Sequence, residues 1–304
     1  MRTAFLGTSD FAAAVLRRLA ASAHRPALVV TPPDRRQGRG RRVAPPPAAA
    51  AANELGLELL QVESVNEEAA RARIAAAAPQ VVAVCAFGQL IREPLLSAYE
   101  MLNVHPSLLP RWRGAAPIER AIMAGDERTG VCVMRLTAGL DSGPVALREE
   151  VEVGSEEVFE ALSGRLAERG GELLVRALDL AERGELGFEE QSEEGVTYAE
   201  KIDPEEARLD PGRPAIELER AVRALAPRVG VYLETADRER FGIRRARAVA
   251  IDLAPGDVEV EDGALLVGCD GGALRLLEVQ PPGGRPMPAD AYLRGHAPPR
   301  RGGG

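Results

Sequence analysis

The chain has 304 residues, of which 45% are hydrophobic and 28% are charged, and its net charge at pH 7 is −8. This length is sufficient for one large domain or two of ordinary size, and the composition is typical of a soluble globular protein. The negative charge argues against indiscriminate binding to nucleic acid, so any contact with RNA must come from local basic patches.

No apolar run approaches the roughly 20 residues of a membrane-spanning helix, so no membrane partner is expected. The first residues enter a strand-like run without the apolar core of a signal peptide. Cys85, Cys132 and Cys269 are too far apart for a metal site or a disulfide framework. These features predict a cytoplasmic protein without a metal. Because no apolar surface stripe stands out, we expect a monomer.

The first part of the chain alternates predicted strands with predicted helices. Residues 3–7 and 27–31 read as buried strands, and a turn at 7–10 leads into apolar residues at helical spacing at 11–21. A strand, a glycine turn and a helix open a doubly wound α/β domain. The turn lacks the Gly-x-Gly-x-x-Gly pattern, so no dinucleotide is expected. Further helices are expected at 45–56 and 66–78, and strands at 58–62 and 81–86.

An arginine-rich stretch without periodicity follows the second strand. Five arginines lie within eight residues, together with two glycines. One interpretation is a solvated loop. The other is a local anion attractor in an acidic protein, because an Arg side chain can grip a phosphate through two donors. The five residues are Arg35, Arg36, Arg39, Arg41 and Arg42.

Residues 101–117 have the pattern most indicative of a functional site. The first residues alternate, so Asn103 and His105 share one face of a predicted strand. Pro106 then ends the strand, and ligands bind at the carboxyl ends of strands in an open α/β sheet. Asn offers an amide donor and His titrates near neutrality. Since a lone His is more often structural, the pattern alone leaves both interpretations open.

A second polar loop, at 137–144, follows the strand predicted at 130–136 and contains Asp141. Gly139 and Gly143 on either side free the backbone to aim this short carboxylate. An Asp before Ser-Gly is also a common turn residue, so its role stays open at this point.

The later chain changes its character. Residues 145–153 read as a strand, and 155–183 read as two helices or one helix with a break near Gly170 and Gly171. A clear helix at 215–224 precedes short apolar runs separated by Gly, Pro and Asp, which is typical of a small β-barrel or sandwich. An arginine cluster in this part could contact phosphates or form a solvated edge strand; its members are Arg238, Arg240, Arg244, Arg245 and Arg247.

Three motifs of the sequence resemble those of the formyltetrahydrofolate-dependent formyltransferases at the spacing of that family. They are Asn103-x-His105-x-Ser107-Leu108-Leu109-Pro110, Arg113-Gly114-Ala115-Ala116-Pro117-Ile118 and Thr137-Ala138-Gly139-Leu140-Asp141-Ser142-Gly143-Pro144. The catalytic Asn, His and Asp of the family fall on Asn103, His105 and Asp141. The resemblance implies 10-formyltetrahydrofolate as the formyl donor, bound without a metal.

The same resemblance implies further site residues and a second domain. Folate binding falls on the aromatic–glycine pair, Phe87 and Gly88, and on the loop residues Ser107, Leu108, Leu109 and Pro110. A core Phe followed by a turn Gly is the structural alternative for the pair, and both descriptions can hold together. The basic loop of the family contacts the tRNA acceptor end, which places that role most directly on Arg39. The C-terminal domain of the family resembles an OB-fold, a fold that often holds nucleic acid.

Taken over its whole length, the chain is most similar to the family members that formylate the amino group of methionyl initiator tRNA. In such a reaction an amide donor stabilises the oxyanion, a His handles the proton and a carboxylate orients the His. The alternative is a formyltransferase for a sugar nucleotide or another small amine, which would not need the basic loop.

The fold class predicted by pattern and resemblance together is α/β. A Rossmann-like domain with an open, parallel-rich sheet is expected at 1–189 and a linker at 190–206. A small OB-like β-barrel domain that binds tRNA is expected at 207–304.

Overall fold

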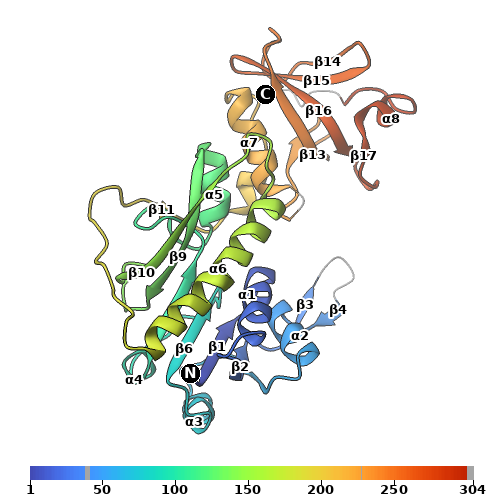
Figure 1. Ribbon diagram of the computed structural model, residues 1–304. Coiled ribbons are helices and arrows are strands. Elements are labelled where there is room, and N and C mark those ends of the chain that lie inside the picture. The colour runs from blue at the N-terminus through green and yellow to red at the C-terminus, as the bar shows by residue number, and fades with distance from the viewer. Residues whose placement is uncertain (38–41, 227, 300–304) are drawn as a thin grey trace. The chain divides into compact units, whose positions relative to one another are not determined.

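The computed structural model describes residues 1–37, 42–226 and 228–299 (Figure 1). The chain forms two compact units. The first consists of Met1–Pro117, Arg128–Glu152 and Glu160–Ala199, and the second of Ile118–Glu127, Val153–Phe159 and Glu200–Gly304. The main division, between Ala199 and Glu200, therefore lies inside the stretch predicted as a linker.

The first unit is built on a seven-stranded sheet with the strand order β10-β9-β7-β6-β1-β2-β5. Strands β5, β2, β1, β6 and β7 run parallel, whereas β9 pairs antiparallel with both β7 and β10. This sheet confirms the predicted α/β class and its open, parallel-rich sheet. The strands are β1 (Thr3–Gly7), β2 (Pro26–Thr31), β5 (Leu59–Gln61), β6 (Val81–Cys85), β7 (Glu100–His105), β9 (Arg128–Arg135) and β10 (Val145–Glu152).

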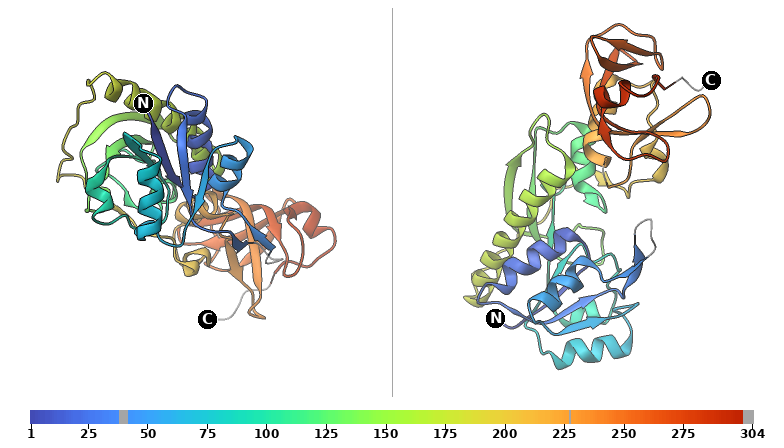
Figure 2. Two further views of the ribbon diagram at one scale, coloured as in Figure 1. Left: turned by 90° about the horizontal axis from the view of Figure 1, so that it is seen from below. Right: turned by 90° about the vertical axis from the view of Figure 1, so that its right-hand side faces the viewer.

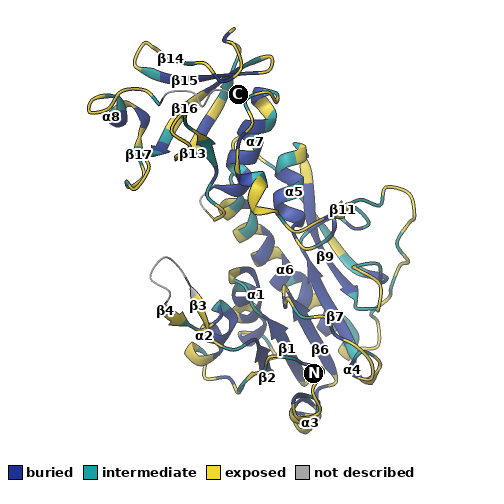
Figure 3. Cartoon of the chain, turned by 180° about the vertical axis from the view of Figure 1, so that it is seen from behind, coloured by how far each residue is buried: buried dark blue, intermediate teal, exposed yellow. Residues whose placement is uncertain are grey.

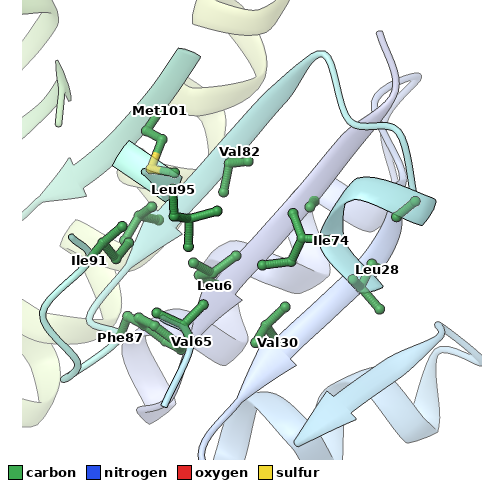
Figure 4. Packing of buried hydrophobic residues seen from close by; sticks show 13 residues of the cluster. Leu6, Leu28, Val30, Val65, Ile74, Val82, Phe87, Ile91, Leu95 and Met101 are labelled. Atoms are coloured by element: carbon green, nitrogen blue, oxygen red, sulfur yellow. The ribbon is translucent and has the colours of Figure 1, made fainter. Parts of the chain in front are cut away.

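Every residue of β1 and β6 is buried, as Figure 3 shows for the centre of the sheet. Continuous apolar strands of this kind are expected where helices cover both faces of a parallel sheet. On one face, Ile74 and Leu95 belong to a buried cluster with Leu6 and Val30 of the sheet (Figure 4). The helices of this unit are α1 (Asp10–Ala20), α2 (Pro47–Glu54), α3 (Glu68–Ala76), α4 (Leu95–Ala98) and α6 (Phe159–Glu182), whereas α5 (Pro117–Ala124) belongs almost entirely to the second unit.

Helix α6 contradicts one prediction, because it continues without a break through Gly170 and Gly171. The two glycines are needed for close packing. A Cβ atom added at Gly170 would lie 2.7 Å from Val104 Cγ1, and one added at Gly171 would lie 2.8 Å from Arg18 Cβ. The helix therefore keeps these glycines because the sheet and α1 approach its axis at this point, which outweighs their unfavourable helix propensity.

The arginine-rich stretch begins and ends in a strand pair. Strand β3 (Arg35–Gln37) pairs antiparallel with β4 (Arg42–Ala44). The expectation of a loop without regular structure is therefore wrong for these flanks, where the paired backbones satisfy their own hydrogen-bonding groups. Arg39 and Arg41 lie outside the described residues.

The second unit contains an antiparallel sheet with the order β12-β13-β16-β15-β14, and β17 also pairs with β16. This sheet, seen from two further sides in Figure 2, confirms a C-terminal β domain after the predicted helix. Its elements are η1 (Pro204–Ala207), α7 (Ala215–Leu225), β12 (Tyr232–Glu234), β13 (Arg240–Val249), β14 (Val258–Glu261), β15 (Ala264–Cys269), β16 (Gly272–Gln280), β17 (Met287–Pro288) and α8 (Ala289–Leu293).

Strand β13, which carries most of the second arginine cluster, lies between β12 and β16. The edge-strand interpretation is therefore wrong for Arg240, which pairs with Glu234 of β12, and it stays a prediction for Arg244, Arg245 and Arg247, beyond that pairing. Short apolar runs alone did not indicate strand order, because that order depends on pairings between distant segments.

Among the described residues, no helix is long and apolar enough to cross a membrane, and no group of His, Cys, Asp and Glu could hold a metal ion. The three cysteines are free and buried.

Candidate active site

The polar residues at the end of β7 meet the aspartate of the later loop. Asn103 is 8% exposed and His105 is 4% exposed. Asn103 Nδ2 lies 3.5 Å from Asp141 Oδ1, and His105 Nδ1 lies 3.6 Å from Asp141 Oδ2. The structure thus brings the three predicted catalytic residues together. Both distances are longer than those of a strong hydrogen bond.

Asp141 is held by one hydrogen bond to its carboxylate and another to its backbone carbonyl. Its φ angle is +43°, a left-handed conformation that a residue other than glycine adopts at a cost of about 1–2 kcal/mol. The Gly114 N–H donates to Asp141 Oδ2 at 2.9 Å, and Gln191 Nε2 donates to the Asp141 carbonyl at 2.7 Å. The surrounding structure therefore holds the carboxylate in a strained but defined position.

The flanking Gly143 has a packing role that the sequence did not predict. A Cβ atom at this position would collide with the Arg135 carbonyl oxygen. Gly143 therefore permits a close approach of two backbone segments, in addition to any freedom it gives the loop.

The two ring nitrogens of His105 have different surroundings. His105 Nε2 lies 2.9 Å from the Trp112 carbonyl oxygen. A carbonyl can only accept, so Nε2 carries a hydrogen in this arrangement. The other nitrogen, Nδ1, faces the Asp141 carboxylate. When Nδ1 is protonated, Asp141 can accept its hydrogen bond, which suits a group that takes up and releases a proton.

The three residues line a cavity of about 510 Å³. Cavities of a few hundred cubic ångströms accommodate organic ligands of cofactor size, with apolar walls and a few polar groups. The exposed side chains of Leu90 and Leu140 also belong to its lining. Other lining residues include Val84, Phe87, Gly88, Gln89, Ile91, Leu136 and Thr137.

The residues expected to bind folate fall into two groups. Phe87 and Gly88 line the cavity, and they also serve as a buried core residue and a turn residue with φ of +75°. The structural description of this pair therefore holds, and its contact with folate stays a prediction.

The loop residues of the second group do not line that cavity. Ser107 is fully buried, and its Oγ donates to the Arg111 carbonyl at 2.6 Å. Leu109 packs into a cluster with Cys132, Met134 and Val145. Leu108 and Pro110 are half-buried. In the described structure these residues shape the loop, and their contact with folate stays a prediction.

The two arginine clusters are described in part. Arg35 and Arg36 are exposed on β3, and Arg35 pairs with Glu63 at 3.3 Å. Arg42 lies in β4, whereas Arg39 and Arg41 lie outside the described residues. In the second cluster, Arg240 stacks over Tyr232, Arg244 bonds to Gln280 and Arg247 pairs with Glu156, while Arg245 is exposed.

Two buried thiols lie near the catalytic residues without a role of their own. Cys132 is the register partner of His105 on β9, and burial raises the pKa of Cys132 to about 11. Burial also raises the pKa of Cys85, at the end of β6. Since the thiolate is the nucleophilic form, neither cysteine is a nucleophile near neutral pH.

Sequence reasoning missed the residues that hold the catalytic aspartate. Gly114 was visible in a motif, but its N–H contact with Asp141 depends on the fold. Gln191 lies in the stretch predicted as a linker, 50 residues from Asp141, and no periodicity marks it.

Comparisons with known proteins identify the family of this chain. Residues 1–178 match the family model described as formyl transferase, and residues 201–297 match the formyl transferase C-terminal domain. The chain therefore belongs to the formyl transferase family.

Full-length relatives show which group within the formyl transferase family the chain resembles. The methionyl-tRNA formyltransferase of Ruegeria pomeroyi is 45% identical over 302 residues, which cover 99% of each chain. That of Paracoccus denitrificans is 44% identical over 303 residues, again 99% of each chain. At this identity and coverage, the chain lies among the methionyl-tRNA formyltransferases.

Solved structures show the same fold at low sequence identity. An N-formyltransferase from Helicobacter canadensis, in complex with folinic acid and dTDP-3-aminofucose, superposes with a TM-score of 0.66 at 12% identity, over 90% of this chain and 98% of that one. HypX from Aquifex aeolicus, in complex with tetrahydrofolic acid, superposes with a TM-score of 0.64 at 18% identity. That match covers 96% of this chain and 47% of HypX, so this chain spans about half of its length.

Proposed function

We propose that the protein transfers a formyl group from 10-formyltetrahydrofolate to the amino group of methionyl initiator tRNA, for the initiation of protein synthesis. The observation that carries the proposal is the convergence of Asn103, His105 and Asp141 on one cavity. The named relatives, similar over the full chain, supply the acceptor.

The chemistry assigned to each residue follows from its position. The amine nitrogen attacks the formyl carbon, and negative charge builds up on the formyl oxygen. The side-chain amide of Asn103 can donate to this oxygen, which stabilises the transition state. His105, oriented by Asp141, takes the proton that the amine loses. The bond from the formyl carbon to the folate nitrogen then breaks, and that nitrogen takes up a proton, so the charges balance.

The cavity is compatible with the formyl donor. Its size and apolar walls suit a planar ring system, and we assign the wall of the folate site to Phe87 and Gly88. We also assign folate contacts to the loop Ser107–Pro110, which follows His105 in the chain.

We assign tRNA contacts to the basic hairpin and to the C-terminal domain. The hairpin places Arg35 and Arg36 on an exposed strand, and Arg39, Arg41 and Arg42 belong to the same proposed surface. The match of residues 201–297 to the C-terminal domain of the family supports a separate RNA-binding domain, proposed here at 207–304. The catalytic domain is proposed at 1–189.

A second candidate function is formyl transfer to an amino-sugar nucleotide, because one structural neighbour was solved with such a compound. A sugar-nucleotide amine would fit the same chemistry. The 12% identity to that neighbour, against 45% to a methionyl-tRNA formyltransferase, favours the tRNA substrate. We further propose that the enzyme acts as a monomer in the cytoplasm, where charged tRNA is used.

The decisive experiment measures formyl transfer from 10-formyltetrahydrofolate to a panel of acceptors. The panel contains methionyl initiator tRNA, methionyl elongator tRNA, free methionine, an amino-sugar nucleotide and water. Rapid transfer to the initiator tRNA alone is expected. Preferred transfer to the sugar amine would establish the second function, and release of formate in water alone would show a hydrolase.

A further inference from the structure

The segment 189–199, most of which falls in the linker predicted at 190–206, contacts both catalytic loops. We call residues 189–199 the strap. At its start, Glu189 pairs with Val145 through two backbone hydrogen bonds of 2.8 and 2.9 Å. At its end, β11 (Tyr198–Ala199) pairs with β8 (Arg113–Gly114). The first end of the strap is therefore paired with the strand that follows the Asp141 loop, and the other end is paired with the loop that follows His105.

The far end of the strap fits closely against the His105 side of the site. Thr197 Oγ1 accepts from the Trp112 N–H at 2.9 Å, and the Ala199 carbonyl accepts from the Ala115 N–H at 2.8 Å. A Cβ atom at Gly114 would lie only 2.7 Å from the Ala199 carbonyl oxygen. Because Trp112 provides the carbonyl that contacts His105, this end of the strap sets the backbone against which the imidazole rests.

The middle of the strap contacts the Asp141 side through one side chain. Gln191 Nε2 donates to the carbonyl oxygens of Asp141 and Gly143, both at 2.7 Å. Gln191 Oε1 accepts from Arg113 Nε at 3.0 Å, and Arg113 is buried. Reversing the amide would set its oxygen against two carbonyls and its NH₂ against a guanidinium. The three contacts therefore specify a single orientation of the side chain.

We propose that Gln191 is a positioning residue for Asp141, and that the strap aligns the Asp141 loop with the loop after His105. The proposal rests on the formyl-transfer function and deepens it by assigning a role to a residue outside the catalytic loops. The strap lies between the two segments that match the family models. Asp141 has a left-handed backbone, so it needs fixed partners to keep its carboxylate facing His105. Gln191 supplies one of them at the Asp141 carbonyl, and its second hydrogen bond holds Gly143 in the same loop.

The test compares Gln191→Ala with a control, Gln80→Ala, in the full-length protein. Gln80 Oε1 also accepts from a backbone N–H, that of Arg2 at 2.9 Å, at the opposite end of β6. Gln191→Ala is expected to lower kcat for methionyl initiator tRNA roughly 10- to 100-fold, with KM within about threefold, because small misplacements of a reacting group cost rate. Gln80→Ala is expected to keep kcat within about twofold.

A double-mutant cycle separates positioning from a merely structural role. If Gln191 acts through Asp141, then adding Gln191→Ala to Asp141→Asn should cost less than about threefold in kcat, because residues that work as a unit are not additive. The same proportional loss in both backgrounds would overturn the positioning role alone. Normal turnover of Asp141→Asn by itself would overturn the proposed site as well.

A second variant keeps the proposal testable if Gln191→Ala folds poorly. Gln191→Glu places a carboxylate against two carbonyl oxygens at pH 8, and protonation at lower pH restores one donor. Its kcat, divided by that of the wild type at each pH, should therefore rise as the pH falls. A ratio that does not change with pH would contradict the proposal.

Discussion

Two buried histidines of this protein each lie beside an aspartate, yet their surroundings differ. His24 is fully buried, with Nε2 2.8 Å from Asp179 Oδ1 and Nδ1 2.8 Å from the Met1 nitrogen. His105 is also buried, but its Nε2 alone has a short partner among the described residues, the Trp112 carbonyl, while Nδ1 lies 3.6 Å from Asp141.

The difference separates a structural histidine from a reactive one. Both nitrogens of His24 are engaged in short hydrogen bonds, so the ring serves packing and polar satisfaction. His105 keeps one loosely engaged nitrogen beside a cavity of about 510 Å³. Incomplete satisfaction costs stability, and proteins retain such arrangements at functional sites.

The largest expected effect comes from substituting the reactive histidine, His105, or its partner Asp141. His105→Ala and Asp141→Asn should each lower kcat about a thousandfold, because positioned proton transfer contributes at most about 10⁴-fold. Binding of folate and tRNA should change only modestly. Single-turnover formylation measures the rate, and near-normal turnover in both variants would rule out the catalytic assignment.

The second prediction concerns substitution of the structural histidine, His24. His24→Ala should lower the free energy of unfolding by about 2 kcal/mol, since it removes a fully buried ring together with its hydrogen bonds to Asp179 and the Met1 nitrogen. The kcat should stay within about twofold of the wild type. Urea unfolding and the formylation assay check this pair of results, and a large loss of kcat at unchanged stability would contradict it.

A third, smaller effect concerns a carboxylate held by an arginine instead of a histidine. Glu206 Oε1 accepts from Arg120 Nη2 at 2.9 Å, and this hydrogen bonding lowers the pKa of Glu206 below its ordinary value of 4.5. A carboxylate with a lowered pKa stabilises the fold above that ordinary value, and the contribution is lost as the pH falls through the folded-state pKa.

Glu206→Gln should therefore destabilise the protein at pH 7 by roughly 0.5–1 kcal/mol, a modest value because solvent screens this partly exposed pair. The difference from the wild type should shrink below about pH 4.5. Urea midpoints of both proteins between pH 7 and acidic pH measure it. A difference that grows on acidification would show that the sign is wrong.

The smallest expected effect concerns Cys132, the strand neighbour of His105. With a pKa of about 11, roughly one thiol in a thousand is ionised at pH 8. Iodoacetamide should therefore leave this cysteine unmodified and kcat unchanged in the native protein. Mass spectrometry of native and urea-unfolded samples provides the comparison, and rapid modification of native Cys132 would contradict its burial.

Much of the fold was predictable because local patterns carried it. The buried runs at β1 and β6 and the capped helix α1 lie within one or two residues of their predicted limits. The break at Gly170 was predicted wrongly, because a glycine selected for close packing looks like a helix breaker in the sequence alone. The strand pair β3–β4 at the ends of the arginine-rich stretch was not predicted, because a three-residue strand rich in arginine shows no apolar alternation.

The sequence by itself determined that Asn103 and His105 leave one strand on the same face, since side chains alternate along a strand. It also marked Asp141 through a glycine-flanked motif shared with a known family. Only the tertiary structure decided how close these groups come and which segment holds them, because such contacts join positions tens of residues apart. Their geometry depends on strand order and packing, and local periodicity carries no information about either.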